Sequence, residues 1–77
     1  MYKANNLCSL REGQSAVVTS LGVGGSMRRR LQDIGLVSGT PVTCLHVSSA
    51  GDPAAYLIRG AVVAIRSDDS QLIKIKQ

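Results

Sequence analysis

Short runs of apolar and β-branched residues recur along the chain, separated by turns rich in glycine and polar residues. The runs are QSAVVTSL at 14–21, TPVTCLHVSS at 40–49, AYLIRG at 55–60, AVVAIRS at 61–67 and QLIKIK at 71–76. Residues of these types favour strands, and several short strands at close spacing are typical of a small barrel. Gly60 separates the third run from the fourth and indicates a tight bend or bulge there. The pattern therefore predicts five strands.

A helical period interrupts the strands after the first run. In the stretch SMRRRLQDIGL, Met27, Leu31 and Ile34 recur at i, i+4 and i+7 and form one apolar face. Ser26 stands where an N-cap is expected, and Gly35 stands at the left-handed position that commonly follows a helix. Because so short a helix is marginal alone, we expect it to dock on the barrel through its apolar face.

Two further stretches predict local turns. Asn5 or Asn6 is placed to cap a single helical turn that leads to Leu10. Asp68 and Asp69, in the sequence DDS, favour a turn before the last strand rather than a pair of metal-binding carboxylates.

These elements fit one domain, residues 1–77. A chain of 77 residues forms a modest core, because a domain of this size buries only about 60% of the surface that its unfolded chain exposes. Lys74 and Lys76 alternate with Ile73 and Ile75, a pattern that keeps an edge strand soluble. We predict a mainly β fold: a small SH3-like β-barrel of about five strands, with a short α-helix inserted after the first strand.

The charge balance indicates an acidic partner. Nine Lys and Arg stand against five Asp and Glu, a net charge of +4. Such a surplus favours nucleic acid, an anionic membrane surface or an acidic protein. The only aromatic residues are Tyr2 and Tyr56, too few to stack on single-stranded nucleic acid or to line a groove for proline-rich peptides. Duplex binding needs only charge and stays open as an alternative.

The same composition favours a cytoplasmic protein. No apolar run approaches the roughly 20 residues of a membrane helix, and the start of the chain, MYKANNLCSL, lacks the long apolar stretch of a signal peptide. Cys8 and Cys44 form no CxxC pair, so we expect reduced thiols.

Three consecutive arginines, Arg28, Arg29 and Arg30, lie in the predicted helix. At 100° per residue they fan around the face opposite the apolar stripe. The helix dipole disfavours cations near the start of a helix by about 0.3–1 kcal/mol each, and Arg29 followed by Asp33 is the weaker order for an ion pair. Two interpretations follow: a solvated face with one stray ion pair, or an edge that binds anions or carboxylates.

Other candidate chemistry is sparse. Cys44 and His46 lie two apart on a predicted strand, which predicts a shared face, and Cys8 is a third soft ligand. No second His and no paired Cys motif completes a site, so a buried Cys and a partly exposed His are favoured, with no metal and no cofactor. The stretch GVGGS lacks the lysine of a phosphate loop, and His46 has no arrangement with a nucleophile. We expect no enzymatic activity.

The series SLREGQSAVVTSLG, MRRRLQDIGLVSGTPV, GDPAAYLIRG and AVVAIRSDDSQLIKI resembles the ferrous iron transport protein A family, FeoA, over nearly the whole chain. Its most specific part is the arginine-rich helix ending in DIGL, followed by Gly39 and Thr40 and later by Arg59 and Gly60. The resemblance implies an SH3-like barrel in the cytoplasm that acts with FeoB, the large membrane GTPase that transports ferrous iron. Cys44 and His46 match no ligand motif of the family.

The expected function is that of a small accessory protein that docks on the cytoplasmic side of FeoB, peripheral to the inner membrane through this partner. We expect Arg28, Arg29, Arg30 and Arg59 to bind the partner's acidic surface, with Arg66 extending the basic face. A basic barrel that binds nucleic acid and a self-associating homo-oligomer are the alternatives. The sequence leaves open whether Cys8, Cys44 or His46 binds metal or is redox active.

Overall fold

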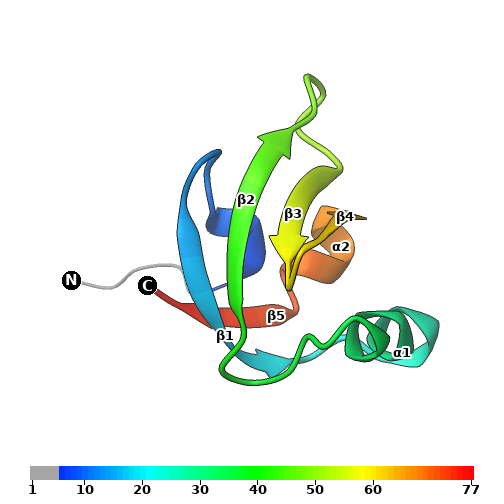
Figure 1. Ribbon diagram of the computed structural model, residues 1–77. Coiled ribbons are helices and arrows are strands. Elements are labelled where there is room, and N and C mark those ends of the chain that lie inside the picture. Colours follow the sequence, from blue (N-terminus) through cyan, green and yellow to red (C-terminus); the bar gives the residue numbers. More distant parts are fainter. Residues whose placement is uncertain (1–5) are drawn as a thin grey trace.

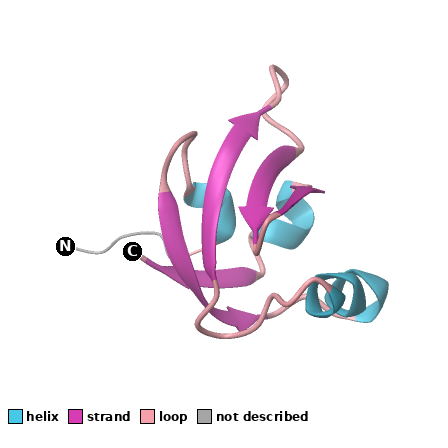
Figure 2. Cartoon of the chain, in the orientation of Figure 1, coloured by secondary structure: helices cyan, strands magenta, loops and turns pink. Residues whose placement is uncertain are grey.

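Strands with alternating burial build one antiparallel sheet, shown in Figures 1 and 2. The computed structural model describes residues 6–77. In chain order the elements are η1 (Leu7–Ser9), β1 (Ser15–Leu21), α1 (Gly25–Asp33), β2 (Pro41–Val47), β3 (Ala54–Ile58), β4 (Ala61–Ile65), α2 (Ser67–Ser70) and β5 (Ile73–Lys76). The strands are hydrogen-bonded in the order β4-β3-β2-β1-β5. The mainly β class, the five strands and the helix after the first strand are confirmed.

Irregular pairing curls the sheet into an open barrel. β1 pairs with β2 through Ser15–Val17 and with β5 through Val17–Leu21, and its register with β5 shifts between Val18 and Ser20. β2 shifts its register with β3 between Cys44 and His46. Because a bulge bends the strand and increases its twist, these two positions let one sheet wrap around its own inner face. β4 and β5 remain as the two edges.

The inner face of the sheet and the helices enclose a core that, within residues 6–77, is aliphatic apart from the ring of Tyr56. Its buried members are Leu7, Leu10, Ala16, Val18, Val23, Leu31, Leu36, Val42, Cys44, Ala54, Tyr56, Ile58, Val63, Ile65, Ile73 and Ile75. Met27 and Ile34 pack against this core from α1, so the predicted apolar stripe of the helix is confirmed. No helix in the described part of the chain is long and apolar enough to cross a membrane.

The helix α1 starts earlier than the sequence suggested. Its N-cap is Gly24, not Ser26, and Ser26 lies inside the helix. Gly25 at the first helical position has a φ of 61°, a conformation that side-chain-bearing residues rarely adopt. The chain therefore enters the helix through glycine backbone rather than through a side-chain cap, and the N-cap prediction was wrong.

The end of α1 agrees with the prediction in detail. Gly35 has a φ of 93° and donates its N–H to the carbonyl of Gln32 at 2.9 Å. The next residue, Leu36, is buried and donates to the carbonyl of Leu31 at 2.9 Å. These two bonds and the left-handed glycine form a Schellman motif, which satisfies the last carbonyls of the helix.

The two predicted turns are both helical. Asn6 is the N-cap of η1, and its carbonyl accepts the Ser9 N–H at 3.1 Å; Asn5, the alternative, lies outside the described residues. The DDS segment forms α2 because Asp52, on the β2–β3 loop, accepts the Ser67 N–H at 2.8 Å. This carboxylate comes from a distant part of the chain, so the local sequence could indicate only a turn.

We expect Gly35→Ala to lower the free energy of unfolding by about 1–2 kcal/mol, the cost of a left-handed backbone for an L-residue. The matched control is Gly24→Ala, where φ is −124° and a Cβ meets nothing within 4 Å. The control should cost less, about 0.5–1 kcal/mol, because Ala is a poorer N-cap residue than Gly but needs no left-handed backbone at this position. Urea unfolding of both variants measures the difference. Equal losses would contradict the role of Gly35 in ending the helix.

Tyr56 predicts a loss of stability at alkaline pH. Burial, followed by the nearby Cys44 thiol, raises the pKa of Tyr56 from 10.0 to about 12. The folded state therefore holds the phenolic proton more tightly than the unfolded state, so this stabilisation is complete below pH 10 and disappears between pH 10 and 12. Urea unfolding across this range should show a decline that is smaller in Tyr56→Phe. Parallel declines would show that Tyr56 is not its source.

Candidate partner-binding surface

A buried threonine fixes α1 to the barrel. Thr40 is 2% exposed, and its hydroxyl accepts the Val37 N–H at 3.0 Å and donates to the Gly35 carbonyl at 3.3 Å. Its own carbonyl accepts the Val18 N–H at 2.9 Å, and Gly39 donates to the Val18 carbonyl at 2.7 Å. The loop after α1 is therefore bonded to β1, so the arginines of α1 are held on a rigid support.

Arg28 is largely committed to the protein itself. Its Nη1 donates to the carbonyl of Leu21 and, at 3.4 Å, to the carbonyl of Val23. These carbonyls belong to the end of β1 and to the connection that leads into α1. Although the residue is exposed, its guanidinium ties the start of the helix to the sheet, which leaves it less free for a partner than the sequence suggested.

Arg29 and Arg30 are exposed on α1. Arg30 lies in the last turn of the helix, where the dipole favours a cation, so the expectation that the arginines oppose the dipole was wrong for this residue. Within residues 6–77 Arg29 forms no ion pair, so the pair with Asp33 that the sequence allows is absent from the structure.

Arg59 joins the arginines of α1 to the sheet. It has a φ of 49° and precedes Gly60, whose φ is 85°, so the two residues form the turn between β3 and β4. The Arg59 Cδ lies 2.6 Å from the position that a Cβ on Gly35 would take. The side chain thus lies across the C-terminal end of α1, and only glycine at position 35 leaves it this space.

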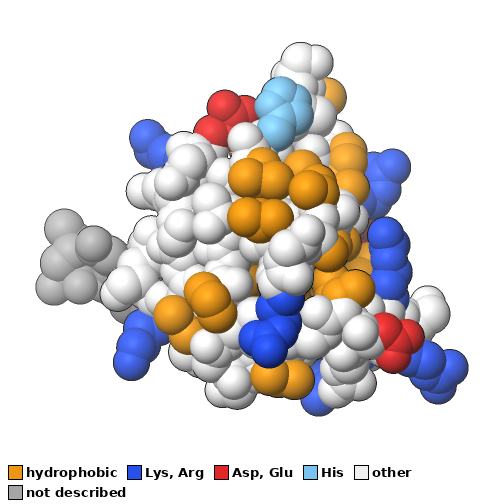
Figure 3. All heavy atoms as spheres, in the orientation of Figure 1, with side chains coloured by type: hydrophobic (Ala, Val, Ile, Leu, Met, Phe, Trp, Pro, Cys, Tyr) orange, Lys and Arg blue, Asp and Glu red, His pale blue; other side chains and the backbone are white. Residues whose placement is uncertain are grey.

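Four exposed arginines define what we call the basic rim: Arg29, Arg30, Arg59 and Arg66. In Figure 3, Lys and Arg side chains line the side of the molecule where Figure 1 places α1 and β4. The structure therefore places Arg59 beside α1, which a single binding surface for these arginines requires. Their common role in binding a partner stays a prediction.

An exposed apolar face adjoins the rim and was not found from the sequence. It comprises Leu45, Leu57 and Val62, which are 42%, 37% and 67% exposed, and Leu57 faces Val62 across the β3–β4 pair. Figure 3 shows apolar side chains gathered over β2 and β3 beside His46. Because β3 and β4 consist almost entirely of apolar residues, hydropathy alone cannot tell their outer face from their inner face.

The prediction that Cys44 and His46 share a face was wrong. Cys44 is fully buried, whereas the His46 side chain is 70% exposed and lies 3.3 Å from the Glu12 carboxylate. The bulge between them adds a residue, which breaks the alternation of the strand. Burial raises the pKa of the Cys44 thiol. Among residues 6–77 no three His, Cys, Asp or Glu side chains converge, and Cys8 lies apart on η1.

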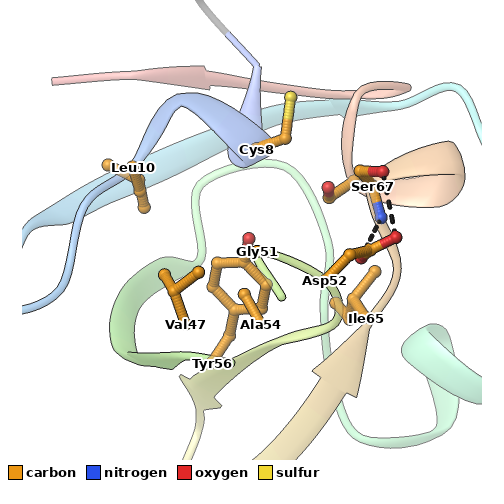
Figure 4. A pocket seen from close by; sticks show the side chains of 10 residues that line it. Cys8, Leu10, Val47, Gly51, Asp52, Ala54, Tyr56, Ile65 and Ser67 are labelled. Atoms are coloured by element: carbon orange, nitrogen blue, oxygen red, sulfur yellow. Dashed lines mark hydrogen bonds between the residues drawn. The ribbon is translucent and has the colours of Figure 1, made fainter. Parts of the chain in front are cut away.

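A small hollow of about 70 Å³ opens between η1, the β2–β3 loop and α2 (Figure 4). Cys8, Tyr56, Asp52 and Ser67 contribute to its wall. The Asp52 carboxylate is already engaged, since it accepts the Ser67 N–H at 2.8 Å and the Ser67 hydroxyl at 3.2 Å. The polar groups of the hollow thus hold α2 in place, and the volume suits a few water molecules rather than an organic ligand.

Comparison with known proteins identifies relatives over almost the whole chain. A family model described as FeoA domain matches residues 5–77. The Fe(2+) transport protein A/Fe(2+) transporter FeoB fusion protein of Porphyromonas gingivalis is 29% identical over 70 residues, which is 91% of this chain. The match spans only 8% of that fusion protein's length.

Solved structures agree. The FeoA protein of Chlorobium tepidum, solved by NMR, superimposes with a TM-score of 0.86 at 32% identity, covering 92% of this chain and 68% of the other. A FeoA of Stenotrophomonas maltophilia, described as a procaryotic SH3 domain protein and complexed with zinc, gives a TM-score of 0.79 at 24% identity over 92% of this chain and 88% of its own. The SH3-like prediction is confirmed.

The left-handed backbone of Arg59 predicts that the turn is not optimised for stability. Asn is the residue that such a turn accepts most readily before Gly, so we expect Arg59→Asn to raise the free energy of unfolding by about 1 kcal/mol. Arg11→Asn is the matched control, because Arg11 is also exposed but has no left-handed backbone to relieve. Chemical denaturation compares the two. A variant at 59 no more stable than the control would show that the Arg59 contact with Gly35 offsets the strain.

Proposed function

The chain belongs to the FeoA domain family, and from this membership we propose that it is a non-enzymatic accessory protein of ferrous iron uptake that docks on the transporter FeoB. The family's named members are ferrous iron transport proteins. The observation that carries the proposal is the fusion protein of Porphyromonas gingivalis, in which both proteins form one polypeptide. Such a link raises the effective concentration of the two domains relative to each other and so favours contact between them.

The basic rim supports docking on an acidic surface. Arg29, Arg30 and Arg59 are exposed, and among the described residues none of them forms an ion pair. A guanidinium can bind a carboxylate through two parallel hydrogen bonds, which gives both affinity and orientation. Arg28 acts in support, because its bonds to backbone carbonyls hold the start of α1.

The apolar face beside the rim favours a protein partner over nucleic acid. Leu45, Leu57 and Val62 are exposed apolar side chains. Binding to the sugar–phosphate backbone of nucleic acid relies on positive charge and makes no use of them. An apolar centre with charged residues at its border is the usual composition of a protein–protein interface. In the cell this docking places the chain at the cytoplasmic side of the inner membrane.

Charge reversal on α1 tests the proposal. We expect Arg29→Glu/Arg30→Glu to weaken binding to purified FeoB by at least about tenfold, since two attractive contacts become repulsive. Binding is measured by biolayer interferometry with FeoB in detergent micelles. The matched control is Lys74→Glu/Lys76→Glu, which makes the same change of charge on β5, at the other edge of the sheet.

The control should bind within about threefold of the unchanged chain, because screened long-range charge contributes little to a distant contact. Equal weakening by both pairs would mean that net charge alone drives binding. If the Arg29→Glu/Arg30→Glu variant binds as tightly as the chain without substitutions, the contact does not involve α1. If the chain without substitutions does not bind FeoB, the proposed function is overturned.

A further inference from the structure

The sheet ends in two edges that differ in how they are protected. β5 carries Lys74 and Lys76 on its outward face, and Asn6 forms a β-bridge to Lys74. Charged residues and a bridging segment are devices that stop an edge from pairing with other chains. β4, at the opposite edge, has the sequence AVVAI, with no charge and no proline.

The β3–β4 turn fixes which backbone groups of β4 point outward. Arg59 and Gly60 both have positive φ, as in a two-residue turn of type I′. In such a hairpin the two flanking residues, here Ile58 and Ala61, face each other and exchange both backbone hydrogen bonds. The pattern of bonded and non-bonded pairs then alternates along the hairpin.

This alternation leaves two residues of β4 with outward backbone groups. Ala61, Val63 and Ile65 direct their N–H and C=O toward β3, whereas Val62 and Ala64 direct theirs away from it. Within residues 6–77 no backbone hydrogen bond joins β4 to any element other than β3. Val62 is 67% exposed and Ala64 is exposed as well. Two N–H and two C=O groups thus form an unused edge.

Both ends of this edge carry positive charge. Arg59 lies in the turn before β4, and Arg66 follows its last residue directly. If two copies of β4 paired antiparallel, the Arg59 end of each would meet the Arg66 end of the other, which places like charges together at both ends. The acidic residues nearest in sequence, Asp68 and Asp69, lie in α2, where the chain has left the edge. The charges therefore select an acidic occupant over a second copy.

We propose that the outer edge of β4 binds an extended, acidic segment of the protein partner by strand addition. This inference rests on the proposed function, because FeoB supplies the segment. Backbone bonds to Val62 and Ala64 align the added strand, and carboxylates near its two ends pair with Arg59 and Arg66. Leu57 and Val62 offer apolar contact to alternate side chains of the segment. Since β4 has five residues, the bound segment is about 17 Å long.

Amide hydrogen exchange tests the edge directly. Exchange is carried out on the complete chain, alone and bound to FeoB in detergent micelles, and is read by NMR after the chain is released. We expect the amides of Val62 and Ala64 to exchange at least about tenfold more slowly in the complex. The amides of Val63 and Ile65 are already bonded to β3, so they should change far less and serve as internal controls.

The outcomes separate this inference from the proposed function. If the complex forms and the Val62 and Ala64 amides exchange as in the free chain, the edge is not the binding site, although the proposed function survives. If no complex forms, both fail. If the two amides become protected in the chain alone as its concentration rises, the occupant is a second copy, and the choice of an acidic partner is wrong.

A substitution gives an independent measurement. Val62→Pro removes an N–H that points away from β3, so the ladder of the hairpin keeps its bonds. Val62→Thr retains the N–H and the β-branched shape. We expect the proline variant to bind FeoB at least about tenfold more weakly and the threonine variant within about threefold. Equal binding by both would overturn the proposal; circular dichroism confirms that each is folded, and if proline unfolds the chain, the exchange experiment decides alone.

Discussion

The structure depends on a single constraint: one sheet of five short strands must wrap around its own inner face to build a core. Among the described residues Tyr56 is the only buried ring, so the core consists otherwise of aliphatic side chains that need close approach on all sides. The irregular pairings in β1 and β2 provide the curvature. Because the curl does not join β4 to β5, two edges remain. The open edge and the outward turn of His46 both follow from this wrapping.

The contact between Gly35 and Arg59 joins the two parts of the surface. Gly35 ends α1 in a left-handed conformation, and Arg59 begins the turn into β4 in another. The arginine needs the glycine, because a side chain at position 35 would displace it. The arginine-rich helix and the edge strand are thereby held as one surface. An arginine in a turn that prefers asparagine is consistent with a position kept for its charge rather than for stability.

The sequence predicted what local rules determine and missed what distant contacts determine. The strands, the apolar stripe of α1 and the cap at Gly35 depend on residues within one or two turns, and all are confirmed. The start of α1 depended on the unusual backbone of Gly25, and α2 depended on Asp52 from the β2–β3 loop. The surface was harder still. In a strand made only of apolar residues, the sequence does not show which side chains, such as that of Val62, face solvent. The bulge in β2 turned the His46 side chain to the outer face, which the sequence also did not show.

The bridge between Asn6 and Lys74 brings the beginning and the end of the described chain together at the β5 edge. This edge lies across the sheet from β4, as Figure 1 shows. A linker joined at either end would therefore leave α1 and β4 unobstructed. A short flexible tether holds its partner at an effective concentration of about 1 mM. A contact with a Kd of about 100 µM, mostly dissociated between separate proteins at low concentration, would then be occupied about nine-tenths of the time. The architecture is thus suited to weak, reversible docking by a permanently attached copy as well as by a free one.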